Sequence, residues 1–218
     1  MSDTHISHRP VYKNNVVRMD RKVLRNIPAE TLLPPILRDK RIVGVLDIEN
    51  MSIGARDLGR AISYEALQLL LSDMTNSLDL HACFSKEPND NWSEHECRRG
   101  GYKPHARDIV KVMTPNGVRR FANSDLRMAF TAGRILRQRA FDVVLFGTGD
   151  GDLGCELASA ARTSLGRQVL IGTMSTPGCL SRRLQISTNP EIDFNIVLGA
   201  DCLLASPARP APQSPITN

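Results

Sequence analysis

Short apolar runs alternate along this chain with stretches in which apolar residues recur every three or four positions. The two clearest runs, Ile42–Leu46 and Val143–Phe146, are continuous and rich in β-branched residues. A continuous run is typical of a strand buried on both faces, because a strand with one wet face alternates apolar with polar residues. Further strands are predicted at Leu78–Phe84, Ile109–Met113, Val169–Ile171 and Phe194–Val197.

Helical spacing fills most of the intervals between these strands. It predicts helices over Leu58–Met74, Ser124–Arg137 and Leu153–Thr163, and a short helix over Cys179–Leu184. Pro115-Asn116-Gly117 predicts a turn. Strands that alternate with helices, and that are apolar on both faces, predict an α/β fold with a doubly wound parallel sheet. On the helix over Ser124–Arg137 we expect an apolar side made of Leu126, Ala129, Phe130, Ile135 and Leu136.

The two ends of the chain differ from its middle. Residues 1–40 show no sustained period and contain several prolines, which predicts a partly disordered arm with a short helix near Met19–Asn26. Residues 205–218 are rich in Pro, Ser and Ala and are expected to be a disordered tail. One domain is therefore predicted over residues 41–204.

The net charge of +5 is concentrated at the N-terminal end. Residues 1–41 hold nine Lys and Arg against four Asp and Glu, so the remaining chain holds 19 of each sign, from totals of 28 and 23. A basic arm suits RNA, because each neutralised phosphate releases counterions. A solvated leader without a partner explains the same charge.

Composition and cysteine usage narrow the class of protein. With 41% hydrophobic and 23% charged residues, the chain can form a sizeable globular core. No apolar run approaches the ~20 residues that cross a bilayer, and the polar start lacks a secretory signal, so no membrane partner is expected. The five cysteines are scattered and form no C-x-x-C pair, which predicts free thiols in a cytoplasmic protein.

Acidic residues directly follow the two clearest strands. The first strand runs into Asp47-Ile48-Glu49-Asn50, and the later one into Gly147-Thr148-Gly149-Asp150-Gly151-Asp152. In open parallel sheets, ligands bind outside the carboxyl ends of the strands. Asp150 and Asp152 are two positions apart, so in an extended segment they would point the same way. The three glycines would let the backbone turn tightly and approach a ligand.

Carboxylates grouped in this way repel one another unless a cation lies among them. Oxygen ligands without His or Cys partners favour Mg²⁺ or Mn²⁺ over Zn²⁺. Each acid also has a structural interpretation: Asp152 would cap the following helix, Asp47 would cap a turn, Asp125 would complement a helix dipole, and Glu49 would face solvent. Two acidic strand ends in one chain favour the metal site.

Three motifs in order carry a resemblance to a known family. They are Asp47-x-Glu49-Asn50 after the first strand, Asn123-Ser124-Asp125 at the start of a middle helix, and GTGDGD after a later strand. Together with the segment Gly166–Gly172, they resemble the NYN domain of the PIN-like nuclease superfamily, over the range from Arg41 to Leu204.

The resemblance implies a three-layer α/β/α sandwich with a central, mainly parallel sheet, and a metal-dependent ribonuclease. Mg²⁺ or Mn²⁺ would be held by Asp47, Asp125, Asp150 and Asp152, which would also carry catalysis. Asn50 and Thr148 would help to position the substrate, and Arg127 lies close enough to Asp125 in the sequence to contact RNA. The family often has a second helix acid where this chain has Thr131, so a catalytically silent RNA-binding protein remains an alternative, and a homo-oligomer fits either function.

The motifs also allow two other interpretations. His95, Cys97 and His105 supply three candidate zinc ligands where a structural site needs four. The acidic loops loosely resemble those of haloacid-dehalogenase-like phosphatases, although Glu49 stands where that family has an aspartate. The segment from Lys86 to Arg107 mixes aromatic with basic residues, which fits either single-stranded RNA or a solvated insertion; these residues are Trp92, Arg98, Arg99, Tyr102, Lys103 and Arg107.

Overall fold

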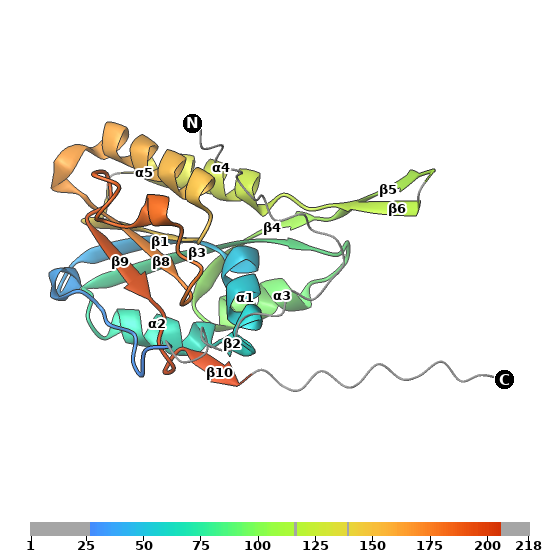
Figure 1. Cartoon of the computed structure of the whole chain (residues 1–218). Coiled ribbons are helices and arrows are strands. Elements are labelled where there is room, and N and C mark those ends of the chain that lie inside the picture. The colour runs from blue at the N-terminus through green and yellow to red at the C-terminus, as the bar shows by residue number, and fades with distance from the viewer. Residues whose placement is uncertain (1–26, 116, 139, 206–218) are drawn as a thin grey trace, which may run out of the picture.

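A parallel sheet forms the middle layer of the molecule, as Figure 1 shows in a computed structural model that describes residues 27–115, 117–138 and 140–205. Its strand order is β4-β3-β1-β7-β8-β9, and every neighbouring pair runs parallel. The predicted α/β/α sandwich with a central parallel sheet is confirmed. The strands are β1 Arg41–Asp47, β3 Ser77–Lys86, β4 Tyr102–Asp108, β7 Val143–Gly147, β8 Leu170–Ser175 and β9 Phe194–Val197.

Helices cover both faces of this sheet. On one face lie α4 (Ser124–Leu136) and α5 (Gly151–Leu165), and on the other lie α1 (Ile48–Asp57), α2 (Tyr64–Ser72) and α3 (Trp92–Arg99). Successive residues of a strand point to opposite faces. The continuous apolar runs therefore contribute side chains to two separate hydrophobic cores, one on each face of the sheet. Val43, Val45, Val144 and Phe146 pack under α4 and α5.

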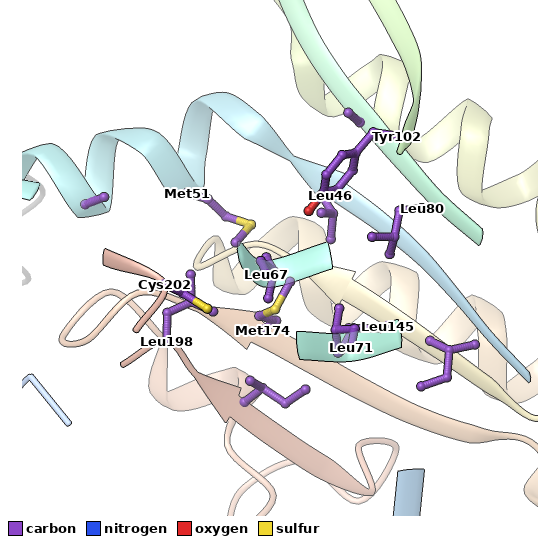
Figure 2. Close-up of a cluster of buried hydrophobic side chains, with 14 of the residues drawn as sticks. Leu46, Met51, Leu67, Leu71, Leu80, Tyr102, Leu145, Met174, Leu198 and Cys202 are labelled. Atoms are coloured by element: carbon purple, nitrogen blue, oxygen red, sulfur yellow. The ribbon is translucent and has the colours of Figure 1, made fainter. Parts of the chain in front are cut away.

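The second core lies on the α1–α2 face. Figure 2 shows part of it, with Leu46 of β1 and Leu145 of β7 near Met51 of α1 and Leu67 and Leu71 of α2. All five side chains are at most 1% exposed. Burial of both sheet faces explains why the central strands read as unbroken apolar runs.

Several short elements lie outside the central sheet. The short strands β2 (Arg60–Ile62) and β10 (Leu203–Ala205) pair antiparallel, as do β5 (Val110–Thr114) and β6 (Gly117–Phe121), whose ribbon projects away from the body. The described residues also form three single turns of 3₁₀ helix: η2 Pro35–Leu37, η3 Gly166–Gln168 and η4 Arg182–Leu184.

The predicted helix over Leu58–Met74 is wrong in its first part. Gly59 adopts a positive φ of 68°, which ends α1, and β2 follows at once. The helix α2 then begins at Tyr64 and is capped by Ser63, whose Oγ accepts a hydrogen bond from the Ala66 amide at 3.2 Å. The helix α1, directly after β1, was not predicted.

The strand predicted at Ile109–Met113 exists as β5, but it belongs to the ribbon and not to the central sheet. The sheet strand in this region is β4, which lies in the polar segment where the sequence pattern predicts no strand. As an edge strand, β4 buries only its first residue, Tyr102, and it tolerates Pro104. Its sequence therefore lacks an apolar run.

Two helix predictions also need correction. Of the expected helix over Cys179–Leu184, only η4 is helical. On α4, Leu126 and Phe130 are exposed, the latter by 67%. The buried side of α4 is instead made of Ser124, Met128, Thr131, Ala132, Ile135 and Leu136, at spacings of three and four that include polar residues.

The folded domain includes residues N-terminal to the predicted start at 41. The Thr31 amide and hydroxyl donate to Asp201 at 2.7–3.0 Å, and Leu37 is 1% exposed. The helix predicted near Met19–Asn26, and the tail after Ala205, lie outside the described residues. Within the described part of the chain, no helix has both the length and the apolar character needed to cross a membrane.

Candidate functional site: an acidic edge at the strand-order reversal

The order of the strands reverses between β1 and β7, which are neighbours in the sheet. From β1 the chain proceeds through β3 to β4 on one side, and from β7 through β8 to β9 on the other. Connections that leave two neighbouring strands in opposite directions open a crevice at their carboxyl ends, where ligands bind in folds of this kind. Asp47 ends β1, and Thr148 to Asp150 follow β7, so both acidic motifs lie at this crevice.

A hydrogen bond joins the two motifs. The Gly149 amide donates to Oδ1 of Asn50 at 2.7 Å, and the Asp150 amide donates to Oγ1 of the fully buried Thr148 at 3.1 Å. Asn50 and Thr148 were predicted to position the substrate. Their side-chain oxygens hold the loop after β7, and through it they position Asp150.

Asp47 is the buried member of the site, with 2% of its surface exposed. It caps α1 by accepting a hydrogen bond from the Asn50 amide at 3.0 Å. The pKa of Asp47 is raised to about 6, mainly by burial, with the charges of Asp125 and Glu49 adding to the rise and the hydrogen bond from the Asn50 amide opposing it. The folded protein therefore holds this carboxylate where its negative charge is costly.

Asp125 and Asp150 come from the starts of the two helices on the other face. Asp125 lies in the first turn of α4, whereas Asp150 caps α5, accepting from the Asp152 and Leu153 amides at 2.8 and 3.1 Å. Burial raises the pKa of Asp125, and the charges of Asp150 and Glu49 raise it as well. The charge of Asp125 thus interacts with that of Asp47 on one side and with that of Asp150 on the other.

Glu49 is a fourth carboxylate at this edge, although the sequence suggested that it faces solvent. It is half-buried, and its Oε1 accepts a hydrogen bond from the Ser85 amide at the end of β3, at 3.1 Å. Its charge raises the pKa of both Asp47 and Asp125. The signal for Glu49 was its place in the Asp-x-Glu-Asn motif. We refer to Asp47, Glu49, Asp125 and Asp150 as the acidic edge.

Asp152 does not join this group. Its side chain is 89% exposed and forms an ion pair with Arg183. The prediction that it points the same way as Asp150 assumed an extended segment, but α5 begins at Gly151, and neighbouring helix residues diverge by about 100°. The alternative that Asp152 caps the helix is also wrong, because Asp150 is the cap.

The glycines after β7 serve the protein's own packing. A Cβ on Gly149 would lie 2.4 Å from the Cys179 carbonyl oxygen, and one on Gly151 would lie 2.3 Å from the Ser181 hydroxyl. Both contacts are far too short for any side chain. These glycines therefore allow the segment after β8 to pack against the loop, whereas the sequence had suggested close approach to a ligand.

Arg127 and Thr131, also singled out from the sequence, face the sheet from α4. Burial raises the pKa of the Cys83 thiol on β3 and lowers that of His105 on β4, and the charge of Arg127 acts on both in the lowering direction. Thr131 is 1% exposed. An acid at position 131 would therefore be buried against the sheet.

The three candidate zinc ligands are not brought together. The Nε2 of His105 lies 2.8 Å from Nδ1 of His81, with the rings stacked between β3 and β4. Cys97 instead lines a cleft beside α1, and His95 is exposed on α3. A zinc site made of these residues has no support in this arrangement.

The acidic edge fits Mg²⁺ or Mn²⁺ by its chemistry. All four donors are carboxylates, the ligands that these hard cations prefer, and a cation would relieve the repulsion that raises the pKa values of Asp47 and Asp125. Among the described residues, however, no three His, Cys, Asp or Glu side chains are grouped closely enough to hold an ion. The donor set suits the ion, while its present spacing is wider than a closed coordination shell.

Comparison with known proteins identifies the fold but no family. No protein-family model matches the chain, and no curated protein matches it. The structure is similar to the crystal structure of a protein of unknown function from Vibrio parahaemolyticus, with a TM-score of 0.57 and 15% identity, covering 77% of this chain and 98% of that one. At this identity, the similarity shows the fold alone.

Proposed function

We propose that this protein is a metal-dependent ribonuclease of the NYN type, acting at the acidic edge in a cytoplasmic setting. The observation that carries the proposal is the convergence of four carboxylates at the strand-order reversal, with Asp47 buried and its pKa raised to about 6. Structural acids are normally paired or exposed. A buried carboxylate with no cationic partner among the described residues, at the ligand-binding edge, is typical of a functional site. The five free cysteines support a reducing compartment.

Asp47, Asp125 and Asp150 would hold the ion, with Glu49 as the fourth acid. A bound Mg²⁺ or Mn²⁺ would supply an activated water and neutralise charge on the scissile phosphate. Within the chain, Asn50 and Thr148 fix the loop that carries Asp150, and Ser85 fixes Glu49. One carboxylate of the acidic edge would orient this water or accept its proton.

RNA is the proposed substrate because of the resemblance of the three ordered motifs and the basic N-terminal residues. The second candidate is a catalytically silent RNA-binding protein of the same fold. It is favoured by one observation, the absence of three closely grouped ligands among the described residues.

Cleavage of single-stranded and structured RNAs by pure protein with Mn²⁺ tests the proposal. The informative variant is Asp150→Asn, because asparagine caps a helix as well as aspartate does. We expect it to lower cleavage at least about 100-fold, since even loss of a group that only supports a metal ligand costs 10- to 100-fold.

The matched control is Asp152→Asn, two residues away on the exposed side of the same helix. Its ion pair with Arg183 is on the surface, so cleavage should stay within about fivefold of the unmodified protein. Equal cleavage by Asp150→Asn and the unmodified protein would contradict the proposal. Binding of RNA without cleavage would support the silent alternative, and release of phosphate from small phosphomonoesters alone would indicate a phosphatase.

A further inference from the structure

A cleft lies beside the acidic edge, between α1 and α3, which are neighbours on the same face of the sheet in Figure 1. Its larger chamber has a volume of about 640 Å³, and a smaller one of about 360 Å³ extends toward the start of α2. Both volumes are within the range of roughly 300–1,000 Å³ seen for small-ligand sites. Trp92 lines both chambers, and it is 72% exposed.

The wall of the larger chamber combines apolar surface with a few polar atoms. Ile48, Ile53 and Phe84 contribute apolar side chains. Ser85 also lines it, and its Oγ is buried without a hydrogen-bond partner. A buried hydroxyl without a partner is uncommon, and a ligand with a donor or acceptor would satisfy it. The chamber therefore suits a flat ligand that is apolar on its faces and polar at its rim.

The same chamber is continuous with the acidic edge. Glu49 and Ser85 both line it, and the Ser85 amide donates to Glu49 at 3.1 Å. Glu49 also interacts with Asp47 and Asp125 through its charge. A longer molecule would thus occupy the chamber with one part and reach the acidic edge with the part that adjoins it. A small ligand in the chamber would not reach that edge.

The charges around the cleft favour a polynucleotide over a free anion. Arg56 lines the larger chamber, is exposed, and forms no ion pair with another described residue. Glu49 and Glu96 also line it, so a small anion would be repelled there. A neutral base in the chamber, with its phosphate outside near Arg56, satisfies both signs of charge.

We propose that this cleft seats one unpaired nucleobase of an RNA strand, stacked on Trp92, with the adjoining phosphodiester directed to the acidic edge. The inference rests on the proposed function, and it adds a substrate class: RNA that is single-stranded at the cut. A base that stacks on a side chain in a cleft is removed from its duplex, so paired RNA cannot occupy this site.

Trp92 is itself the probe, because it is the single tryptophan among 218 residues. Its fluorescence is measured during titration with a single-stranded RNA oligonucleotide in EDTA, which prevents metal-dependent cleavage. We expect saturable quenching by this oligonucleotide. A strand of the same length without bases, and a perfectly paired duplex, should quench little. Equal quenching by the baseless strand or by the duplex would overturn base stacking.

Substitution separates stacking from general affinity. Trp92→Ala should weaken binding of a dye-labelled single strand roughly 5- to 100-fold, which is the effect of losing one base–aromatic stack. Trp92→Phe should restore most of the affinity. Leu32→Ala is the matched control, since Leu32 is 76% exposed in a segment that does not line the cleft, and its affinity should be unchanged. Equal affinity of Trp92→Ala and the unmodified protein would also overturn the proposal.

The two proposals can fail separately. Quenching and a Trp92 effect on binding, without cleavage in Mn²⁺, would support the cleft and reject the nuclease. Cleavage that depends on Asp150, with no quenching and no effect of Trp92→Ala on affinity, would support the nuclease and reject the cleft.

Discussion

The two ends of the strand pair β1–β7 shift the pKa of an aspartate in opposite directions. At the amino end, Asp142 accepts hydrogen bonds from the Arg41 amide and guanidinium at 2.8–3.1 Å, and these bonds hold the pKa of Asp142 at about 2. At the carboxyl end, Asp47 is buried, and its pKa is raised to about 6. The same residue type is stabilised as an anion at one end and destabilised at the other.

This difference separates an acid that serves the fold from one that serves a function. Asp142 is partly exposed and has its own cation, so its charge is satisfied within the chain. Asp47 has acidic neighbours, and a positive charge from outside the chain would complete its surroundings. Four predictions test this contrast, beginning with the largest expected effect.

RNA cleavage should depend on Asp47 at the carboxyl end of the strand pair and not on Asp142 at its amino end. We expect Asp47→Asn to lower RNA cleavage in Mn²⁺ at least about 100-fold, because it removes a carboxylate of the acidic edge. Asp142→Asn should leave the rate per folded molecule unchanged. The measurement is cleavage rate under saturating Mn²⁺, with folding checked by circular dichroism. A large loss in Asp142→Asn would remove the contrast.

The folding stability of the metal-free protein should respond to Asp47 with the sign of a raised pKa. Protonated Asp47 is favoured in the folded state, so stability is fully present below the unfolded pKa of about 4 and is lost as the pH rises through about 6. We expect Asp47→Asn to raise the free energy of unfolding by about 2 kcal/mol at pH 8 in EDTA, and by much less at pH 4. Denaturant unfolding at both pH values measures this, and a destabilised variant at pH 8 would refute it.

Mn²⁺ should replace the missing positive charge at the acidic edge. At ten times its dissociation constant, the ion should stabilise the unmodified protein by about 1.4 kcal/mol, or a few degrees in Tm. Asp142→Asn should show the same shift, and Asp47→Asn little or none. The experiment is thermal unfolding across a Mn²⁺ series. An equal shift in all three proteins would place the ion elsewhere.

The smallest expected effect is the change in folding stability on substitution of Asp142, at the amino end of the strand pair. The lowered pKa of Asp142 stabilises the folded state above pH 4, and this contribution is lost as the pH falls toward about 2. Asp142→Asn should therefore destabilise the protein slightly at neutral pH and not at all at the acid limit, a pH trend opposite to that of Asp47. Salt should weaken the effect, because the ion pair with Arg41 is partly exposed.

Much of the fold could be predicted because its central strands are buried on both faces. The runs at Ile42–Leu46 and Val143–Phe146 became β1 and β7, and the acids after them lie at the strand-order reversal. Elements with weaker burial were missed or misplaced. The edge strand β4 has no apolar run. The helix α1 contains Gly54, a residue type that disfavours helix. Glycine is needed there because a Cβ at this position would lie 2.2 Å from the hydroxyl of Thr176, in a distant segment of the chain.

The direction of individual side chains was the least predictable feature. Spacing in the sequence suggested that Asp150 and Asp152 act together, and solvent exposure was one interpretation of Glu49. The start of α5 at Gly151 turns Asp152 outward to Arg183, and the amide of Ser85 draws Glu49 to the acidic edge. Both outcomes depend on where a helix begins and on a partner from another strand.

Continuous apolar runs report burial on both faces, and parallel strands end at one edge of a sheet, so the pattern along the chain was enough to predict that two acidic motifs end buried parallel strands. Which acids lie together at that edge depends on the packing of the folded protein: they are Asp47, Glu49, Asp125 and Asp150. Charge coupling depends on distances between residues far apart in the chain, and these are set by how α1, α4 and α5 pack on the sheet.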